Sequence, residues 1–133
     1  MEHLSVSLLL DTHAALWLVQ GDSRLGDRAR QRIESARPTD LAISDMLLLE
    51  LAMLIQKQRV VVKGDHTVFL DRLAHRFVVV PVSGVIAVDA MSLSLEQADP
   101  FDRVFVATAR NLSAELVTRD EAIHRSGLVS VVW

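Results

Sequence analysis

The 133-residue sequence contains no cysteine, no tyrosine and no long hydrophobic run. The absence of cysteine excludes disulfides, thiol nucleophiles and cysteine-ligated zinc, and it fits a reducing compartment. The first apolar run, residues 4–10, ends at Asp11 and is too short for a signal peptide or a transmembrane helix. We therefore expect a cytoplasmic protein with no membrane contact.

Aromatic residues are also scarce, at 5% of the sequence, so a platform that stacks unpaired bases is not expected. We place the two tryptophans, Trp17 and Trp133, in the core or at an interface. Half of the residues are hydrophobic. Because this exceeds what solubility favours, part of the apolar material is expected to serve a partner or a self-interface.

Short apolar runs alternate with helical patterns along the whole chain. The predicted strands are residues 4–10, 41–43, 77–80, 115–118 and 129–132, with 60–62 ambiguous. The predicted helices are residues 12–19, 25–36, 45–58, 66–75, 85–93 and 100–111, with a short helix from Asp120. This alternation predicts a single α/β domain over residues 1–133, with a central, mostly parallel sheet and helices on both faces.

Acidic and hydroxyl side chains follow several of the predicted strands. Asp11 follows the first strand, Ser44 the second, and Asp120 comes after Leu116-Val117-Thr118. In a doubly wound sheet, ligands bind beyond the carboxyl ends of the strands, so these side chains can converge there. Each also fits the simpler role of N-cap for the next helix, and both interpretations stay open.

Glu50 is the one charged residue between Asp45 and Lys57. A buried carboxylate is costly unless it is paired or binds a metal ion. On a helix, its neighbours one turn away are all apolar: Met46, Leu47, Met53 and Leu54. Glu50 is thus a candidate metal ligand. The alternative is that this apolar stripe faces a partner, with Glu50 at its rim.

Asp102 lies three residues after Asp99, at the start of a helix that opens with Pro100. The pair fits a capping arrangement with a favourable dipole interaction. However, Phe105 and Val106 follow Asp102 at helical spacing, so its stripe also points inward. Asp99 is left between a helix cap and a nearby acid of the site.

Several carboxylates brought together repel one another, and without cations some would have to take up protons. A hard divalent ion with oxygen ligands removes this conflict. Mg²⁺ or Mn²⁺ suits an all-carboxylate site, because no cysteine or paired histidine competes for it. Such an ion activates a water molecule and stabilises charge on a phosphate. The acids therefore predict metal-dependent phosphodiester hydrolysis.

Four segments stand out in order: Leu9-Leu10-Asp11-Thr12-His13-Ala14, Glu50-Leu51-Ala52, Asp99-Pro100-Phe101-Asp102-Arg103 and Val117-Thr118-Arg119-Asp120. In this order and at these spacings they resemble the PIN-domain family, and more closely its VapC-type toxins of type II toxin–antitoxin pairs. The resemblance spans nearly the whole chain.

The resemblance implies a PIN-like three-layer α/β/α fold and an endoribonuclease that cleaves RNA with Mg²⁺ or Mn²⁺. Carried over by position, Asp11, Glu50 and Asp102 would be the core catalytic metal ligands, with Asp120 as a fourth. Roles in orienting ligands or water would fall to Asp99, Thr12, Ser44 and Thr118.

The resemblance also implies partners. Family members typically bind a small cognate antitoxin, whose C-terminal segment lies across the active site, and they commonly form homodimers. Any DNA contact would come through the antitoxin, because no DNA-reading helix is apparent here. Relatives often have an aromatic residue just before the glutamate and a basic residue soon after it. Here residues 48–55 are apolar apart from Glu50, which suits an antitoxin groove.

Three features are candidate RNA contacts. His13 follows Asp11 by two residues and is interpreted as a base, a phosphate ligand or simply a histidine at a helix start. Arg103 is expected to pair with a carboxylate or reach a phosphate. The arginines between positions 24 and 37 form either a solvated helix face or an RNA-facing strip. The net charge of -3 argues mildly against nucleic-acid binding.

Two other functions compete with the toxin hypothesis. A regulatory receiver-like binding module needs a lysine at a late strand end, but Lys63 is the last lysine in the chain. A phosphatase with an aspartate nucleophile would want a second acid two residues after Asp11, where His13 stands. A PIN nuclease of RNA processing without a toxin role also remains open.

Overall fold

The computed structural model describes residues 5–133. Those residues form a five-stranded, fully parallel sheet in the order β3-β2-β1-β4-β5. The strands are β1 (Leu8–Leu10), β2 (Leu41–Ser44), β3 (Val78–Val80), β4 (Glu115–Val117) and β5 (Val131–Val132). The prediction of a parallel α/β sheet is confirmed.

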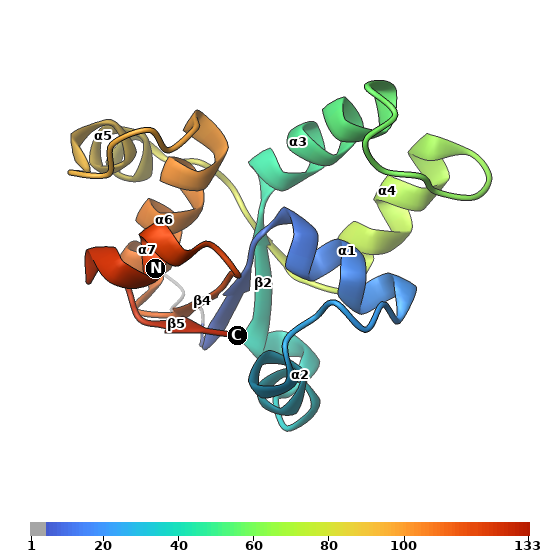
Figure 1. Ribbon diagram of the computed structural model, residues 1–133, viewed down its shortest axis with the longest axis horizontal. Helices are drawn as coiled ribbons and strands as arrows, with labels where there is room; N and C mark the ends of the chain where they lie inside the picture. The colour runs from blue at the N-terminus through green and yellow to red at the C-terminus, as the bar shows by residue number, and fades with distance from the viewer. Residues whose placement is uncertain (1–4) are drawn as a thin grey trace.

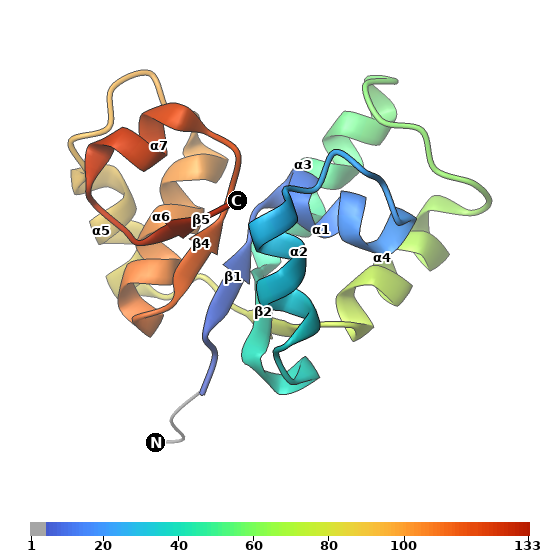
Figure 2. The same cartoon turned by 60° about the horizontal axis from the view of Figure 1, so that its bottom comes forward.

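The helices fall on two sides of this sheet (Figures 1 and 2). One side carries α1 (Thr12–Gln20), α2 (Asp27–Glu34), α3 (Asp45–Gln56) and α4 (His66–His75). The other carries α5 (Gly84–Ser92), α6 (Pro100–Leu112) and α7 (Glu121–Ser126). A short 3-10 turn, Pro38–Asp40, precedes β2. The three-layer α/β/α prediction is therefore confirmed.

The central strands are apolar because both of their faces are covered. All of β1 and β2 is buried, and α6 packs across β1, β2 and β4. Parallel strands between two helical layers lack a solvent face, so they read as continuous apolar runs without alternation. The core therefore lies on both sides of β1, which is the strand that leads directly to Asp11.

Several predicted boundaries were too generous. The first strand begins at Leu8, and Leu4, which the prediction included, lies outside the described residues. Residues 60–62 form no strand. The second helix begins at Asp27, because Leu25 is buried in the preceding turn and Gly26 is the N-cap. An apolar residue in the sequence looks the same whether it is buried in a turn or in a helix, so the pattern did not separate Leu25 from the helix.

None of the helices in residues 5–133 combines the length and apolar character that a bilayer crossing requires.

Candidate metal-dependent active site

The candidate site lies where the chain order of the sheet reverses. Strand β1 pairs with β2 on one side and with β4 on the other. Ligands of open α/β sheets bind at such a switch point, beyond the carboxyl ends of the strands. Asp11 follows β1, and Thr118 and Asp120 follow β4, so the fold brings them to the same edge.

Asp11 is both a helix cap and a member of this site. Its Oδ1 accepts a hydrogen bond of 2.9 Å from the backbone N–H of Ala14, as an N-cap of α1 does. Burial raises the pKa of its carboxyl, and the charge of Asp120 adds to the rise. The Thr118 hydroxyl, the Ala14 N–H and His13 act in the opposite direction. Asp11 therefore caps α1 and also lies in the cleft with Asp102 and Asp120, while its role as a metal ligand stays a prediction.

Glu50 lies on α3 at the border of its buried face. That face consists of Leu47, Leu51 and Ile55, while Glu50 itself is half-buried. The buried Thr12 hydroxyl donates a hydrogen bond to Oε1 of Glu50, which ties α3 to the start of α1. The expectation of a carboxylate surrounded by core was thus too strong, since residues on either side of Glu50 remain partly exposed.

The pKa of Glu50 is raised, first by burial and then by the charges of Asp99 and Asp11. The hydrogen bond from Thr12 partly offsets this rise. Because the Coulomb interaction weakens with distance, these couplings place three carboxylates from different segments in one electrostatic neighbourhood.

Asp102 shows the strongest effect. Burial, followed by the charges of Asp99, Glu50, Asp11 and Asp120, raises its pKa to about 7. Asp99 lies beside it as the N-cap of α6, where its Oδ1 accepts a 2.8 Å hydrogen bond from the Asp102 N–H. Asp99 is therefore a cap, and its charge also acts on the site.

Asp120 is the most exposed of the four predicted ligands. Its Oδ1 accepts a 2.9 Å hydrogen bond from Ile123 N–H and caps α7. Its own N–H donates to the hydroxyl of buried Thr118 at 3.1 Å. Thr118 thus orients the loop between β4 and α7 and lies next to Asp11.

Asp11, Asp102 and Asp120 line one narrow cleft of about 200 Å³, together with His13, Thr118, Arg119 and Trp133. Glu50 is connected to this cleft through the Thr12 hydroxyl. Ser44, by contrast, is fully buried and spends its hydroxyl on capping α3 through Met46 N–H. Ser44 is therefore a helix cap, and its predicted role in orienting a ligand stays a prediction.

The donor set suits a hard divalent cation. Its members are carboxylate oxygens. Burial, and then the charges of neighbouring acids, raises the pKa of Asp102, so a cation would offset an unfavourable interaction. Within residues 5–133, no three acidic or histidine side chains lie close enough together, as they stand, to hold a metal ion. The oxygen ligands suit Mg²⁺ or Mn²⁺ by their chemistry and charge, whereas the present positions of the side chains do not by themselves form a metal site.

The prediction that Arg103 pairs with a carboxylate is wrong, and its contact with RNA stays a prediction. Its guanidinium donates to the carbonyl oxygens of Ala90, Leu93 and Leu95, at 3.2, 3.1 and 2.6 Å. Five fixed donors make arginine well suited to gathering several carbonyls. Arg103 therefore fastens the segment that leads from α5 toward α6, behind the site.

The arginines between positions 24 and 37 do not form one strip. Arg32 pairs with Glu115 at 2.6 Å, and Arg37 pairs with Asp40 at 3.1 Å. Arg30 donates to the backbone carbonyl of Asp22. Only Arg24 reaches the neighbourhood of the site, where its guanidinium lies over the ring of Trp17.

Sequence reasoning overlooked Arg119 and Trp133, which both line the acidic cleft. Trp133 packs edge-on against buried Trp17, with ring centroids 6.0 Å apart. Arg119 stands between two predicted site residues, Thr118 and Asp120. This position between two candidate residues was the one feature of the sequence that could have pointed to Arg119.

Comparison with known proteins gives a consistent picture. The model of the PIN domain family matches residues 8–127. Ribonuclease VapC22 of Mycobacterium tuberculosis is 33% identical over 130 residues, which is 96% of this chain and 98% of that protein.

Solved structures agree on the fold. A toxin–antitoxin complex from Klebsiella pneumoniae has a chain with 26% identity and a TM-score of 0.68, covering 96% of this chain and 97% of its own. DNA-bound VapBC from Salmonella typhimurium has a chain with 15% identity and a TM-score of 0.72, with the same coverages of 96% and 97%. At that lower identity the likeness concerns the fold alone.

Proposed function

The chain belongs to the PIN-domain family, and on that premise we propose that it is a Mg²⁺- or Mn²⁺-dependent endoribonuclease that acts as the toxin of a toxin–antitoxin pair. One observation supports the metal-dependent chemistry most strongly. Four acids from separate segments meet at the switch point, where burial and then the charges of neighbouring acids raise the pKa of Asp102 to about 7. The VapC22 relative, a ribonuclease by name, supports RNA as the substrate.

In this proposal Asp11, Glu50 and Asp102 hold the ion, with Asp120 at the open side of the cleft. When bound, the ion would lower the pKa of a water molecule and offset charge on the attacked phosphate. The chain's own groups do the positioning. Thr12 fixes one oxygen of Glu50, the N-terminus of α1 fixes one oxygen of Asp11, and Thr118 shapes the loop that presents Asp120.

The direct test is RNA cleavage by purified protein with Mg²⁺ or Mn²⁺, with and without EDTA. Wild type should cleave only with metal, and Glu50→Gln should lose the activity. Glu121→Gln is the matched control, because Glu121 is an exposed acid of α7 that pairs only weakly with Arg125 at 3.5 Å. Equal cleavage by wild type and Glu50→Gln would overturn the assignment.

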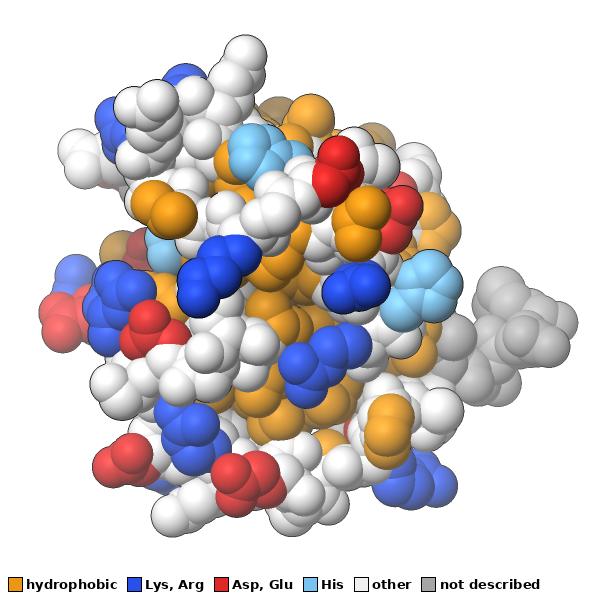
Figure 3. Space-filling model, turned by 90° about the vertical axis from the view of Figure 1, so that its right-hand side faces the viewer, with side chains coloured by type: hydrophobic (Ala, Val, Ile, Leu, Met, Phe, Trp, Pro, Cys, Tyr) orange, Lys and Arg blue, Asp and Glu red, His pale blue; other side chains and the backbone are white. Residues whose placement is uncertain are grey.

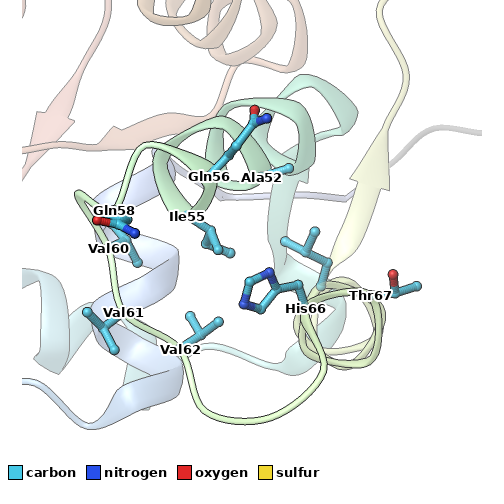
Figure 4. A pocket seen from close by; sticks show the side chains of 10 residues that line it. Ala52, Ile55, Gln56, Gln58, Val60, Val61, Val62, His66 and Thr67 are labelled. Atoms are coloured by element: carbon cyan, nitrogen blue, oxygen red, sulfur yellow. The ribbon is translucent and has the colours of Figure 1, made fainter.

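The proposed partner is a small antitoxin that covers an apolar groove. A hollow of about 840 Å³ lies between α3, the segment 57–65 and α4. Figure 3 shows hydrophobic side chains gathered on this face between basic and histidine side chains. In Figure 4, Ile55, Val60, Val62 and His66 point toward one another, whereas Thr67 points away. An apolar helix face is a common guest for such a groove.

Expression tests the toxin role separately from the enzyme activity. We expect growth arrest when the chain is expressed alone and relief when a small protein from the neighbouring gene is co-expressed. Val62→Asp should weaken that relief while leaving RNA cleavage intact, because Val62 lies in the groove, outside the set of acids. Cleavage without toxicity would favour an RNA-processing nuclease. In either role, DNA contact is proposed only through the partner.

A homodimer is also part of the proposal. Apolar side chains remain exposed along one face of α5, at Val85, Val88 and Met91, where 65 to 69% of each side chain is accessible. Leu49 on α3 is 58% exposed. Contiguous exposed apolar residues mark interaction sites in soluble proteins. Light scattering should show a dimer for wild type and a monomer for Val88→Asp.

The receiver-like alternative loses support in the structure. Lys63, the last lysine, lies exposed in the loop between α3 and α4, away from the carboxyl ends of β4 and β5. The lysine that such a module needs at a late strand end has no counterpart in this chain.

A further inference from the structure

A second hollow, of about 390 Å³, adjoins the acidic cleft and is lined by basic side chains. Arg24, Arg59 and Arg119 line it together with His13 and the ring of Trp17. These residues come from α1, from three loops and from opposite ends of the sequence. We call this hollow the basic groove. No acidic side chain is among its lining residues.

Trp17 is the platform of the basic groove. The guanidinium carbons of Arg24 and Arg119 both lie 4.8 Å from the centroid of its ring, although the tryptophan itself is only 3% exposed. The electron-rich face of an indole attracts a guanidinium and limits its rotamers. Trp133 supports the ring from the edge. The two cations are thereby held in place before any ligand arrives.

The cations of this groove are only partly neutralised. Arg24 pairs with Asp22 at 2.8 Å. However, 62% of the Arg24 side chain is exposed, so a ligand can still reach its guanidinium. In the part of the chain that the structure describes, neither Arg59 nor Arg119 makes an ion pair with a carboxylate. Both residues are exposed. Planar guanidinium groups in this state match the oxygens of a phosphate.

The basic groove is continuous with the site. His13 and Arg119 line both the basic groove and the cleft that holds Asp11, Asp102 and Asp120. A polyanionic strand that places one phosphate at the acids therefore has its neighbouring phosphates within reach of the arginines. Because such a strand is the substrate proposed for the acids, this continuity favours a nucleic acid over an acidic polypeptide in the basic groove.

We propose that the basic groove binds the backbone of single-stranded RNA next to the cleaved bond, with Arg59 and Arg119 contacting phosphates and the ring of Trp17 holding Arg119 in place. The proposal rests on the ribonuclease function proposed above, and it adds the path of the strand. It also accounts for RNA binding by a chain whose net charge is -3, because the positive charge is local.

The test is the salt dependence of RNA binding. A short, unstructured fluorescent RNA is titrated with the Asp102→Asn protein, which is expected not to cut it, at several salt concentrations. Each lost phosphate contact should reduce the slope of log K against log salt by about 0.7 for a single strand. Arg119→Gln and Arg59→Gln should each do this and weaken binding about tenfold at low salt.

Arg76→Gln is the matched control. Arg76 is an exposed arginine that precedes β3, at the opposite edge of the sheet from the site. It should change neither slope nor affinity. Arg119→Lys should keep the slope and recover part of the affinity, since it retains the charge and loses the flat stack on Trp17. In the active background, the groove variants should raise KM more than they lower kcat.

Unchanged slopes for Arg59→Gln and Arg119→Gln, or an equal loss in Arg76→Gln, would overturn the proposal. So would binding of polyglutamate as tight as that of RNA and lost in the same variants, because the groove would then belong to an acidic polypeptide. Failure of the parent function is distinguishable. In that case wild type does not cleave RNA with any metal, whatever the arginine variants bind.

Discussion

The acidic cleft and the basic groove share His13 and Arg119, yet their side chains are held in opposite ways. Asp11, Glu50 and Asp102 are partly buried, and burial, with the charges of neighbouring acids, raises the pKa of each. The arginines are exposed and two of them rest on one tryptophan. Burial and repulsion therefore disfavour the charged form of these acids, whereas solvent screens the charges of the exposed arginines. We therefore expect substitutions of the acids to change stability more than substitutions of the arginines.

The largest expected effect is on the acid side. Asp11→Asn, Glu50→Gln and Asp102→Asn should each reduce RNA cleavage by more than about 100-fold, since even groups that only support metal ligands are worth about 10–100-fold. Asp120→Asn should cost less, because Asp120 is exposed and asparagine caps α7 equally well. Asp99→Asn should cost least. Initial rates on one RNA substrate check this ranking, and a flat ranking would contradict it.

Trp133 lines the acidic cleft and packs against Trp17, which lines the basic groove, so displacing Trp133 should disturb both regions. A Cβ at Gly26 would lie 2.2 Å from the Trp133 carbonyl oxygen. Gly26→Ala should therefore lower the free energy of unfolding by about 1–3 kcal/mol, the usual cost of overpacking. Gly84→Ala is the control, because no atom lies within 4 Å of its Cβ. Denaturant titrations measure both, and equal stability of the two variants would refute the close contact.

One substitution should remove the unfavourable burial and repulsion of the charged Asp102 carboxylate. The folded, metal-free protein holds a proton on Asp102 up to about pH 7, whereas the unfolded chain loses it near pH 3.9. This contribution to stability is present below pH 4 and is lost as the pH rises through about 7. At pH 8 Asp102→Asn should be more stable than wild type by about 1–2 kcal/mol, allowing for solvent screening.

At pH 5 the stability difference between Asp102→Asn and wild type should shrink. Thermal unfolding in EDTA at the two pH values measures it. A variant less stable than wild type at pH 8 would mean that the carboxylates do not repel one another.

The smallest effect is expected for Arg32, which is close to Arg24 in the sequence but does not line the basic groove. Arg32 pairs with Glu115, with 46% and 30% of the two side chains exposed. Arg32→Gln should cost less than about 1 kcal/mol of stability and leave RNA affinity unchanged. Anisotropy titrations beside Arg119→Gln check this, and a matching loss of affinity would extend the RNA surface onto α2.

The acids were predictable from the sequence because parallel strands deliver the residues that follow them to one edge. Asp11 and Asp120 needed only the strand pattern, and Glu50 needed the unusual absence of other charges on its helix. The basic groove was not predictable. Arg24, Arg59 and Arg119 lie in loops whose meeting on Trp17 depends on tertiary packing, which leaves no periodic signal.

Arg103 is a second case in which the sequence could not show where a side chain lies in the fold. Its place beside Asp102 suggested an ion pair, but the fold turns its guanidinium to three backbone carbonyls. Adjacent residues on a helix point in different directions, so a neighbour in sequence is not a neighbour in the site.

Titration of Mn²⁺ into metal-free protein, followed by electron paramagnetic resonance, tests the central claim most directly. Wild type should bind Mn²⁺ saturably at pH 8 and more weakly at pH 6, because Asp102 must release its proton to serve as a ligand. Asp102→Asn and Glu50→Gln should lose this binding, and Glu121→Gln should keep it. Binding that is the same in all four proteins and at both pH values would contradict the account.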